Sequence, residues 1–300
     1  MSGQLFSRGV RAAAVAVLAL TTTVGAAGTA AATSPEDHPI EVGVDASGIR
    51  APDSHQGGLV SFRVKTADAN GRQLQLLRPH DGVSLDRVLH DLADSISSTP
   101  STAATGIRAV RGEAEALGGA LVTPQIHEQF TEAISPGTVY LLDFTAFRAD
   151  PAHPVVKSMQ LVGTNGQSAN QARFPGGIVI QQDTTEGPRF HTMDVVNAHL
   201  SYLVHNDSTE IRDMQLRPVA SGTTDAQVQT YLDKAAAGGK PSSPFTGPAT
   251  GLGAISPGRT ALVQSHGLKP GSYVLLCSVP DEKRGLPHAF LGTHKVVELR

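Results

Sequence analysis

The stretch PGTVYLL (residues 136–142) returns near the end of the chain as PGSYVLL (residues 270–276). The tripeptide LRP stands at residues 77–79 and again at 216–218, so its two copies are separated by nearly the same interval. Two anchors that recur in the same order indicate one structural unit present twice. The sequence therefore predicts a tandem arrangement of two similar domains.

The composition places the boundaries of these domains. The segment GTNGQSANQ (residues 163–171) is rich in turn-forming residues and has no apolar period, so we interpret it as a linker. It separates a first domain at 38–162 from a second domain at 172–300. Each domain then has roughly 125 residues, which is within the usual range for a domain.

Short apolar runs dominate both units and have the character of strands. LVSFRV (59–64) and LSYLV (200–204) carry β-branched or aromatic residues, and QLQL (73–76) alternates with period two. A helical spacing of apolar residues interrupts each unit once, at 84–92 and at 224–237. The pattern predicts an all-β protein of two antiparallel β-sandwich domains, each with one short helix.

The N-terminus has the features of a secretory signal peptide. Arg8 and Arg11 precede an apolar run at 12–20, and three alanines at 30–32 offer a cleavage site. The apolar run is shorter than the roughly 20 residues that a membrane-spanning helix needs. We therefore expect residues 1–32 to be removed and the protein to be secreted, with no membrane span afterwards.

Charge and cysteine content exclude several classes of protein. The chain has 24 Lys and Arg against 27 Asp and Glu, a net charge of −3, and no segment gathers basic residues. Nucleic acid is therefore not expected as a partner. The single cysteine, Cys277, excludes an internal disulfide framework, so stability must come from packing.

The C-terminal region carries a resemblance to a known family. The stretch PGSYVLLCSVPD (270–281), followed by GLPHA (285–289), resembles the last part of small exported cupredoxin-like domains. RDMQLR (212–217) and RQLQLLR (72–78) stand where these domains carry an earlier strand with a metal ligand. The resemblance implies that both units are cupredoxin-like sandwiches.

The resemblance also implies which residues stand at the metal positions of the second unit. A blue copper site needs one cysteine, two histidines and usually a methionine. Cys277 matches the cysteine and His288 the C-terminal histidine, whereas Arg212 stands in place of the first histidine and Thr293, next to His294, in place of the methionine. The predicted metal residues are Cys277, His288 and His294, which do not make a complete set.

The first unit retains none of these ligands. Arg72 replaces the histidine, Asp143 replaces the cysteine, and Pro154 falls opposite His288. An acid directly after two leucines on an apolar strand needs a partner, because an unpaired buried charge is costly. We therefore hypothesise that Arg72 and Asp143 form an ion pair.

Two functional hypotheses remain open. No catalytic motif is found, since His127-Glu128 lacks a second histidine at Thr131, so we expect a protein that is not an enzyme and has no cofactor. It would bind an unidentified protein or envelope component through loops on a rigid scaffold, with Cys277 an ordinary buried residue. The alternative is an exported copper-binding protein for storage, delivery or electron transfer that uses Cys277 and His288.

Overall fold

The computed structural model describes residues 38–164 and 174–300, and His38–Arg300 forms one compact unit. The expected signal peptide at 1–32 lies outside the described residues, as do residues 165–171 of the expected linker. The remaining two linker residues, Gly163 and Thr164, end a strand.

Strands are the main regular elements of the described chain, with few helices, in agreement with the predicted all-β class. The N-terminal half contains β1 (Ile40–Asp45), β2 (Gly48–Arg50), β3 (Ser54–Lys65), β4 (Arg72–Pro79), α1 (Leu85–Ser95), α2 (Pro100–Glu113), β5 (Ala114–Val122), β6 (His127–Ile134), β7 (Gly137–Asp143), α3 (Phe144–Ala149) and β8 (Val156–Thr164). The C-terminal half contains β9 (Gly177–Thr184), β10 (Gly187–Met193), β11 (Tyr202–Asn206), β12 (Arg212–Pro218), α4 (Asp225–Ala236), β13 (Thr250–Ile255), β14 (Thr260–His266), β15 (Gly271–Leu276), the 3₁₀ helix η2 (His288–Leu291) and β16 (His294–Leu299).

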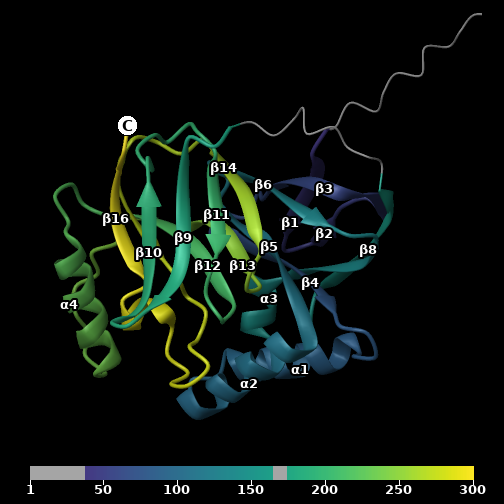
Figure 1. The fold of residues 1–300 in the computed structure, drawn as a ribbon, viewed down its shortest axis with the longest axis horizontal. Coiled ribbons are helices and arrows are strands. Elements are labelled where there is room, and N and C mark those ends of the chain that lie inside the picture. Colours follow the sequence, from purple (N-terminus) through teal and green to yellow (C-terminus); the bar gives the residue numbers. More distant parts are fainter. Residues whose placement is uncertain (1–37, 165–173) are drawn as a thin grey trace, which may run out of the picture. The chain divides into compact units, whose positions relative to one another are not determined.

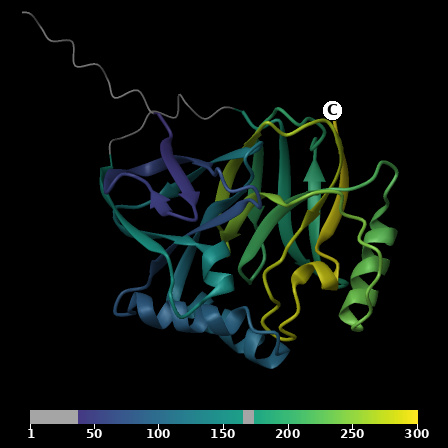
Figure 2. The same ribbon diagram turned by 180° about the vertical axis from the view of Figure 1, so that it is seen from behind.

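The strands form two series that are joined where β3 pairs with β8, and both series run through the two halves of the chain (Figures 1 and 2). One series has the order β10-β9-β11-β14-β6-β3, with β1 and β2 beyond β3. The other has the order β8-β7-β4-β5-β13-β12-β15-β16. The halves meet at two antiparallel pairs, β6 with β14 and β5 with β13. A split into two separate sandwich domains is therefore not confirmed, because backbone hydrogen bonds join the halves in both series.

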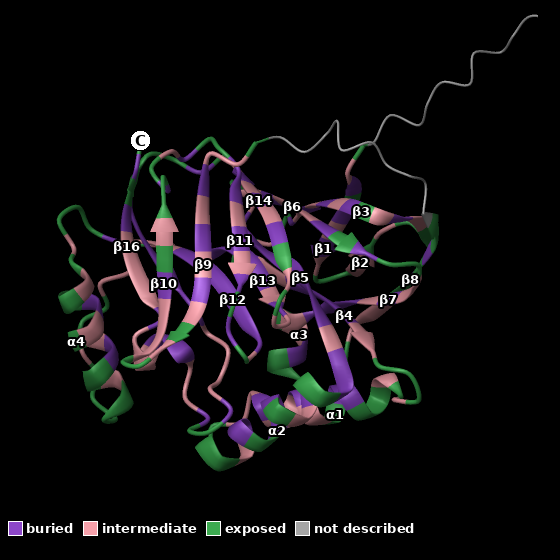
Figure 3. Ribbon diagram, in the orientation of Figure 1, coloured by how far each residue is buried: buried purple, intermediate pink, exposed green. Residues whose placement is uncertain are grey.

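One hydrophobic core extends through both halves. Phe62 on β3 and Phe130 on β6 are fully buried and stack with ring centroids 5.1 Å apart. The same cluster includes Leu76 from β4, Val204 from β11 and Leu275 from β15. Figure 3 shows buried residues along the strands and exposed residues on the outer faces of the helices. Burial of this size is the dominant favourable term in folding and supports the ends of β4, β12 and β15, where the candidate site lies.

The helices differ from the expectation of one per unit, which is wrong for the N-terminal half. The Ser84 hydroxyl accepts a hydrogen bond from the Arg87 amide and caps α1, which agrees with the helical spacing at 84–92, but α2 and α3 are additional. Gly106 lets α2 pack closely on α1, since a Cβ there would lie 2.4 Å from the Ser95 amide nitrogen. Figure 1 shows these two helices together next to β4 and β5, while α4 lies beside β16 (Figure 2). None of the helices within 38–164 and 174–300 has the length and apolar character needed to span a bilayer.

Candidate functional site

Cys277 and His288 come together at the end of β15. The amide of Cys277 donates to the Thr293 carbonyl at 3.2 Å, and the amide of Ala289 donates to the Cys277 carbonyl at 2.9 Å. These backbone bonds place the Cys277 Sγ 3.7 Å from the His288 Nδ1, and both residues are fully buried. The structure thus brings together the two residues that the resemblance selected, and metal binding by them stays a prediction.

The imidazole of His288 lies between two oxygen acceptors. Its Nδ1 is 2.7 Å from the carbonyl oxygen of Val279, and its Nε2 is 2.8 Å from Oε2 of Glu210. A carbonyl oxygen only accepts hydrogen bonds, so Nδ1 must carry the proton and donate it. The Nδ1 lone pair is then not available as a metal ligand in this arrangement.

Arg212 places a permanent positive charge beside the thiol. Its side chain is 2% exposed, its Nε donates to Ser208 Oγ at 3.0 Å, and its Nη2 donates to Asp183 Oδ1 at 2.8 Å. Burial raises the pKa of the Cys277 thiol well above its ordinary value, and the charge of Asp213 adds to this while Arg212 opposes it. The thiol therefore stays protonated at neutral pH, whereas metals bind the thiolate.

Two further residues, Thr293 and Asp213, lie next to Cys277 and His288 at the place where the resemblance implies a metal site. Thr293, at the place of the methionine, is 1% exposed, and its Oγ1 has no hydrogen-bond partner among the described residues. Asp213 holds the backbone after Cys277, because its carboxylate accepts from the amide and the hydroxyl of Ser278, both at 2.6 Å. A protonated thiol, an imidazole with an occupied Nδ1 and a guanidinium in place of the first histidine do not fit a blue copper site.

His294 lies on the opposite face of the sheet. Its backbone pairs with Leu276, whose side chain packs toward α4, while Cys277 belongs to the inner core. The His294 Nε2 is 2.8 Å from Oε1 of Gln229 on α4. Burial lowers the pKa of His294, although the nearby Asp225 opposes this shift. The structure therefore does not bring His294 to Cys277 and His288.

Sequence reasoning missed two carboxylates close to the His288 ring. Each of Glu210, Asp281 and His288 offers one possible ligand atom, and these three atoms lie within 4.8 Å of one another. Burial raises the pKa of Glu210, but hydrogen bonds from His288 and from the Glu282 amide outweigh it, so the pKa of Glu210 is lowered overall. Glu210 and Asp281 are far apart in the sequence and belong to no motif, so only the fold shows that they meet.

The ion pair that we hypothesised in the N-terminal half is confirmed. Nη1 of Arg72 donates to Oδ2 of Asp143 at 3.0 Å, and the Asp143 side chain is 1% exposed. Arg72 also donates to Oδ2 of Asp68, with a distance of 2.7 Å from Nη2. Asp143 has a second task, because its Oδ1 accepts from the Ala146 amide at 3.0 Å and caps α3.

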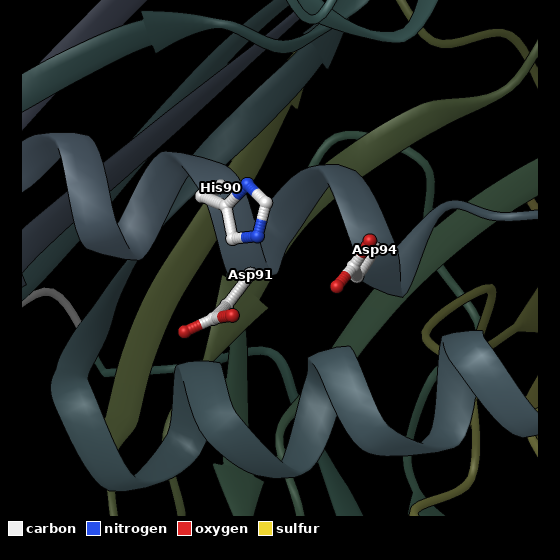
Figure 4. A group of neighbouring side chains, drawn as sticks. All are labelled: His90, Asp91 and Asp94. Atoms are coloured by element: carbon white, nitrogen blue, oxygen red, sulfur yellow. The ribbon is translucent and has the colours of Figure 1, made fainter.

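A further group of metal-ligating side chains lies on α1, and Figure 4 shows its three members, His90, Asp91 and Asp94. His90 is exposed and Asp94 lies one turn further along the helix. Asp91 points toward α2, where burial and a hydrogen bond with Glu113 raise its pKa. The group is confined to one helix and shares no element with the site around His288.

No protein-family model and no curated protein matches the sequence. Solved structures similar to the chain include the cupredoxin auracyanin from Roseiflexus castenholzii and a multicopper oxidase. Rusticyanin from Thiobacillus ferrooxidans is 13% identical over 41% of this chain and 76% of its own, with a TM-score of 0.24. A multicopper oxidase is 11% identical over 88% of each chain, with a TM-score of 0.23. A Cu-containing nitrite reductase from Thermus scotoductus is 10% identical over 88% of this chain and 61% of its own, with a TM-score of 0.24.

These neighbours contradict the expectation that the protein is not an enzyme. A multicopper oxidase and a nitrite reductase are enzymes, and each match extends over 88% of this chain. That expectation is withdrawn. The expectation of no cofactor has no support either.

Proposed function

We propose that the chain is an exported binding protein built from two cupredoxin-like repeats, at 38–162 and 172–300. The order of the strands supports the repeats, since β16-β15-β12-β13 corresponds to β8-β7-β4-β5 when the two halves are compared. In each repeat charged pairs hold positions that metal ligands would take in a copper-binding domain. The repeats then act as a rigid support for loops that contact a protein or an envelope component.

The geometry of His288 carries this proposal. Both ring nitrogens lie within hydrogen-bond distance of oxygens, one from Val279 and one from Glu210. Nδ1 donates its proton to the Val279 carbonyl and Nε2 faces the Glu210 carboxylate, so both ring nitrogens are engaged by oxygen atoms of the protein. The charge of Arg212 nearby further disfavours a metal cation at Cys277.

Copper titration tests the proposal. The purified mature protein, loaded with one equivalent of Cu(II), is expected to show no strong thiolate-to-copper absorption band. An Arg212→His/Thr293→Met variant supplies the ligand types missing from the second repeat and serves as the positive control. A strong band from the wild-type chain at one copper per protein, absent from Cys277→Ser, would refute the proposal.

A copper-binding function is the second candidate, and the distance between Cys277 Sγ and His288 Nδ1, 3.7 Å, favours it. Copper would require Cys277 to lose its proton and His288 Nδ1 to release the Val279 carbonyl. If copper binds at this edge, Cys277→Ser abolishes binding and Glu210→Gln does not. If Cys277→Ser has no effect and Glu210→Gln abolishes binding, the metal is held at the Nε2 edge instead.

A further inference from the structure

A cavity of about 210 Å³ lies between the α1–α2 pair and the strands beneath it. Its lining comes from both halves of the chain, since α1, α2, β4 and β5 face β12, β13 and the 278–287 loop. That loop is fixed to α2, because the Arg111 guanidinium donates to both carboxylate oxygens of Glu282 and a Cβ on Gly285 would overlap the Pro100 carbonyl. The cavity therefore has stable walls on all these sides.

The walls are mainly apolar, and the side chains of Gln75, Asp213 and Glu115 in them already have partners. Apolar side chains that line the cavity include Leu77, Val88, Leu92, Ile107, Val110 and Phe144. The amide of Gln75 donates to three carbonyls and accepts from the Ala254 amide. Asp213 is held by Ser278, and Glu115 is paired with Arg259 at 3.3 Å. Such a lining has few acceptors for a cation and little to offer water.

The fold does not require this cavity. In the C-terminal half the helix over the corresponding strands packs directly on them, and one apolar cluster fills that place with Val219, Val228, Leu232, Val274, Leu276 and Ala289. In the N-terminal half two helices stand in place of one, and open space remains between them and the sheet.

Of the three charged side chains in the lining, Glu115, Arg148 and Asp213, only Arg148 has neither a hydrogen bond nor an ion pair with a described residue. It stands in the last turn of α3, is exposed, and makes no ion pair or hydrogen bond through its guanidinium with any of the described residues. A guanidinium is permanently charged and binds carboxylates with two parallel hydrogen bonds. It therefore favours an anionic group at the edge of an otherwise apolar space.

We propose that this cavity binds a small amphipathic acid, with its apolar part among α1, α2 and the sheet and its carboxylate on Arg148. The size follows from comparison with apolar cavities of about 150 Å³, which hold benzene, so the volume here takes about eight heavy atoms. This site does not depend on whether the second repeat binds copper, because it uses neither Cys277 nor His288.

Octanoate and its uncharged counterpart octan-1-ol test the proposal by titration calorimetry on the full mature chain. We expect octanoate to bind at one per chain and octan-1-ol to bind about tenfold more weakly, as loss of a charge-assisted hydrogen bond predicts. Arg148→Gln is expected to weaken octanoate about tenfold and to leave octan-1-ol unchanged. Lys240→Gln removes one exposed charge away from the cavity and is expected to change neither affinity.

Cavity-filling variants locate the bound chain. Ala103→Leu adds side-chain volume inside the cavity, whereas Ala109→Leu adds the same volume on the same helix outside it. Only Ala103→Leu should abolish octanoate binding, while its Tm without ligand shows that it is folded. If it does not fold, Ala116→Leu on β5 makes the same test.

Three results would overturn the proposal. Failure of octanoate to bind the wild-type chain, or full binding by a folded cavity-filling variant, would remove the cavity as its site. Equal affinities for octanoate and octan-1-ol, unchanged in Arg148→Gln, would remove the carboxylate from the ligand. Each of these results leaves the copper titration at Cys277 unaffected, so the two proposals fail separately.

Discussion

Replacing Asp143 by alanine removes an ion pair and a helix cap in a single change. The Asp143 side chain is 1% exposed, and its two oxygens hold Arg72 Nη1 at 3.0 Å and the Ala146 amide at 3.0 Å. Loss of one partner from a buried pair costs about 3–5 kcal/mol, and loss of a cap costs about 1 kcal/mol. In Asp143→Ala, Arg72 still has its second partner, Asp68, at 2.7 Å. The cost of losing the ion pair should therefore lie near the lower end, about 3 kcal/mol. We expect Asp143→Ala to lower the free energy of unfolding by about 3–4 kcal/mol.

Urea denaturation followed by circular dichroism measures this change, and two further variants separate its parts. Asp143→Asn keeps an oxygen for the Ala146 amide and removes the charge, so it should cost about 1 kcal/mol less than Asp143→Ala. Arg72→Met combined with Asp143→Ala removes both charges and should regain most of the loss, except the part due to the cap. A loss below about 0.5 kcal/mol in Asp143→Ala would place the pair with exposed ion pairs and refute the argument from burial. The argument would also be refuted if the Arg72→Met/Asp143→Ala variant were no more stable than Asp143→Ala.

Three other predictions concern pH, helix packing and export. Burial raises the pKa of Glu128 in the folded protein to about 8, whereas in the unfolded chain it stays near 4.5. The free energy of unfolding should therefore fall as the pH rises from about 4.5 to 8, because the unfolded chain gives up this proton more readily than the folded one. Denaturation curves of Glu128→Gln, which cannot ionise, should show a flatter dependence on pH. Gly106→Ala should lower the free energy of unfolding by about 1–3 kcal/mol, because the added methyl group would overlap α1. Gly112→Ala lies on the same helix with open space around it and should raise the free energy of unfolding by up to about 1 kcal/mol. Unchanged stability of Gly106→Ala would contradict the close packing of the two helices. Mass spectrometry of exported protein should give a start at or near Thr33, and a full-length product held in the membrane would contradict cleavage after 1–32.

The sequence predicted strands and one helix of the N-terminal half well, because these depend on local spacing. Ser84 with Leu85, Val88 and Leu89 is a helix start with an apolar face, and the structure begins α1 there. α2 escaped prediction since its first two turns, PSTAATG, carry small residues with little apolar period. Its stability comes from close contact with α1 at Gly106, a tertiary effect that propensity does not encode.

The joining of the halves escaped prediction for a similar reason. The repeated anchors report what each half contains, but a strand carries no local mark of which neighbour it will pair with. β5 and β6 end the sheets of the N-terminal half, and both pair with strands of the C-terminal half in place of ending at solvent. Pairing covers edges that would otherwise expose unsatisfied backbone groups. A linker prediction from composition therefore says little about whether two repeats remain separate.

The candidate site was predictable only where the resemblance supplied a position. Cys277 and His288 were found that way, and Arg72 with Asp143 followed from the same alignment and the cost of a buried charge. Glu210 was not, because nothing in its sequence surroundings connects it to His288 across the fold. His294 was selected for its place in the sequence, yet strand alternation turns it to the face that packs on α4.

The ion-pair partners determine what a single substitution at these positions should cost. Arg72 is matched by Asp143 at the end of β7, whereas Arg212 is matched by Asp183 on β9 and leaves the end of β15 free to keep Cys277. His288 in turn depends on Glu210. Since an unpaired buried charge costs more than the pair contributes, replacing one member alone should be destabilising, while replacing both should be close to neutral. A metal ligand in place of Arg212 would leave Asp183 without its ion-pair partner, which costs little because Asp183 is partly exposed. A metal ligand in place of Arg72 would leave the buried Asp143 without its ion-pair partner, which is costly. Of the two halves, only the C-terminal one is thus suited to metal-site reconstruction by substitution at this arginine.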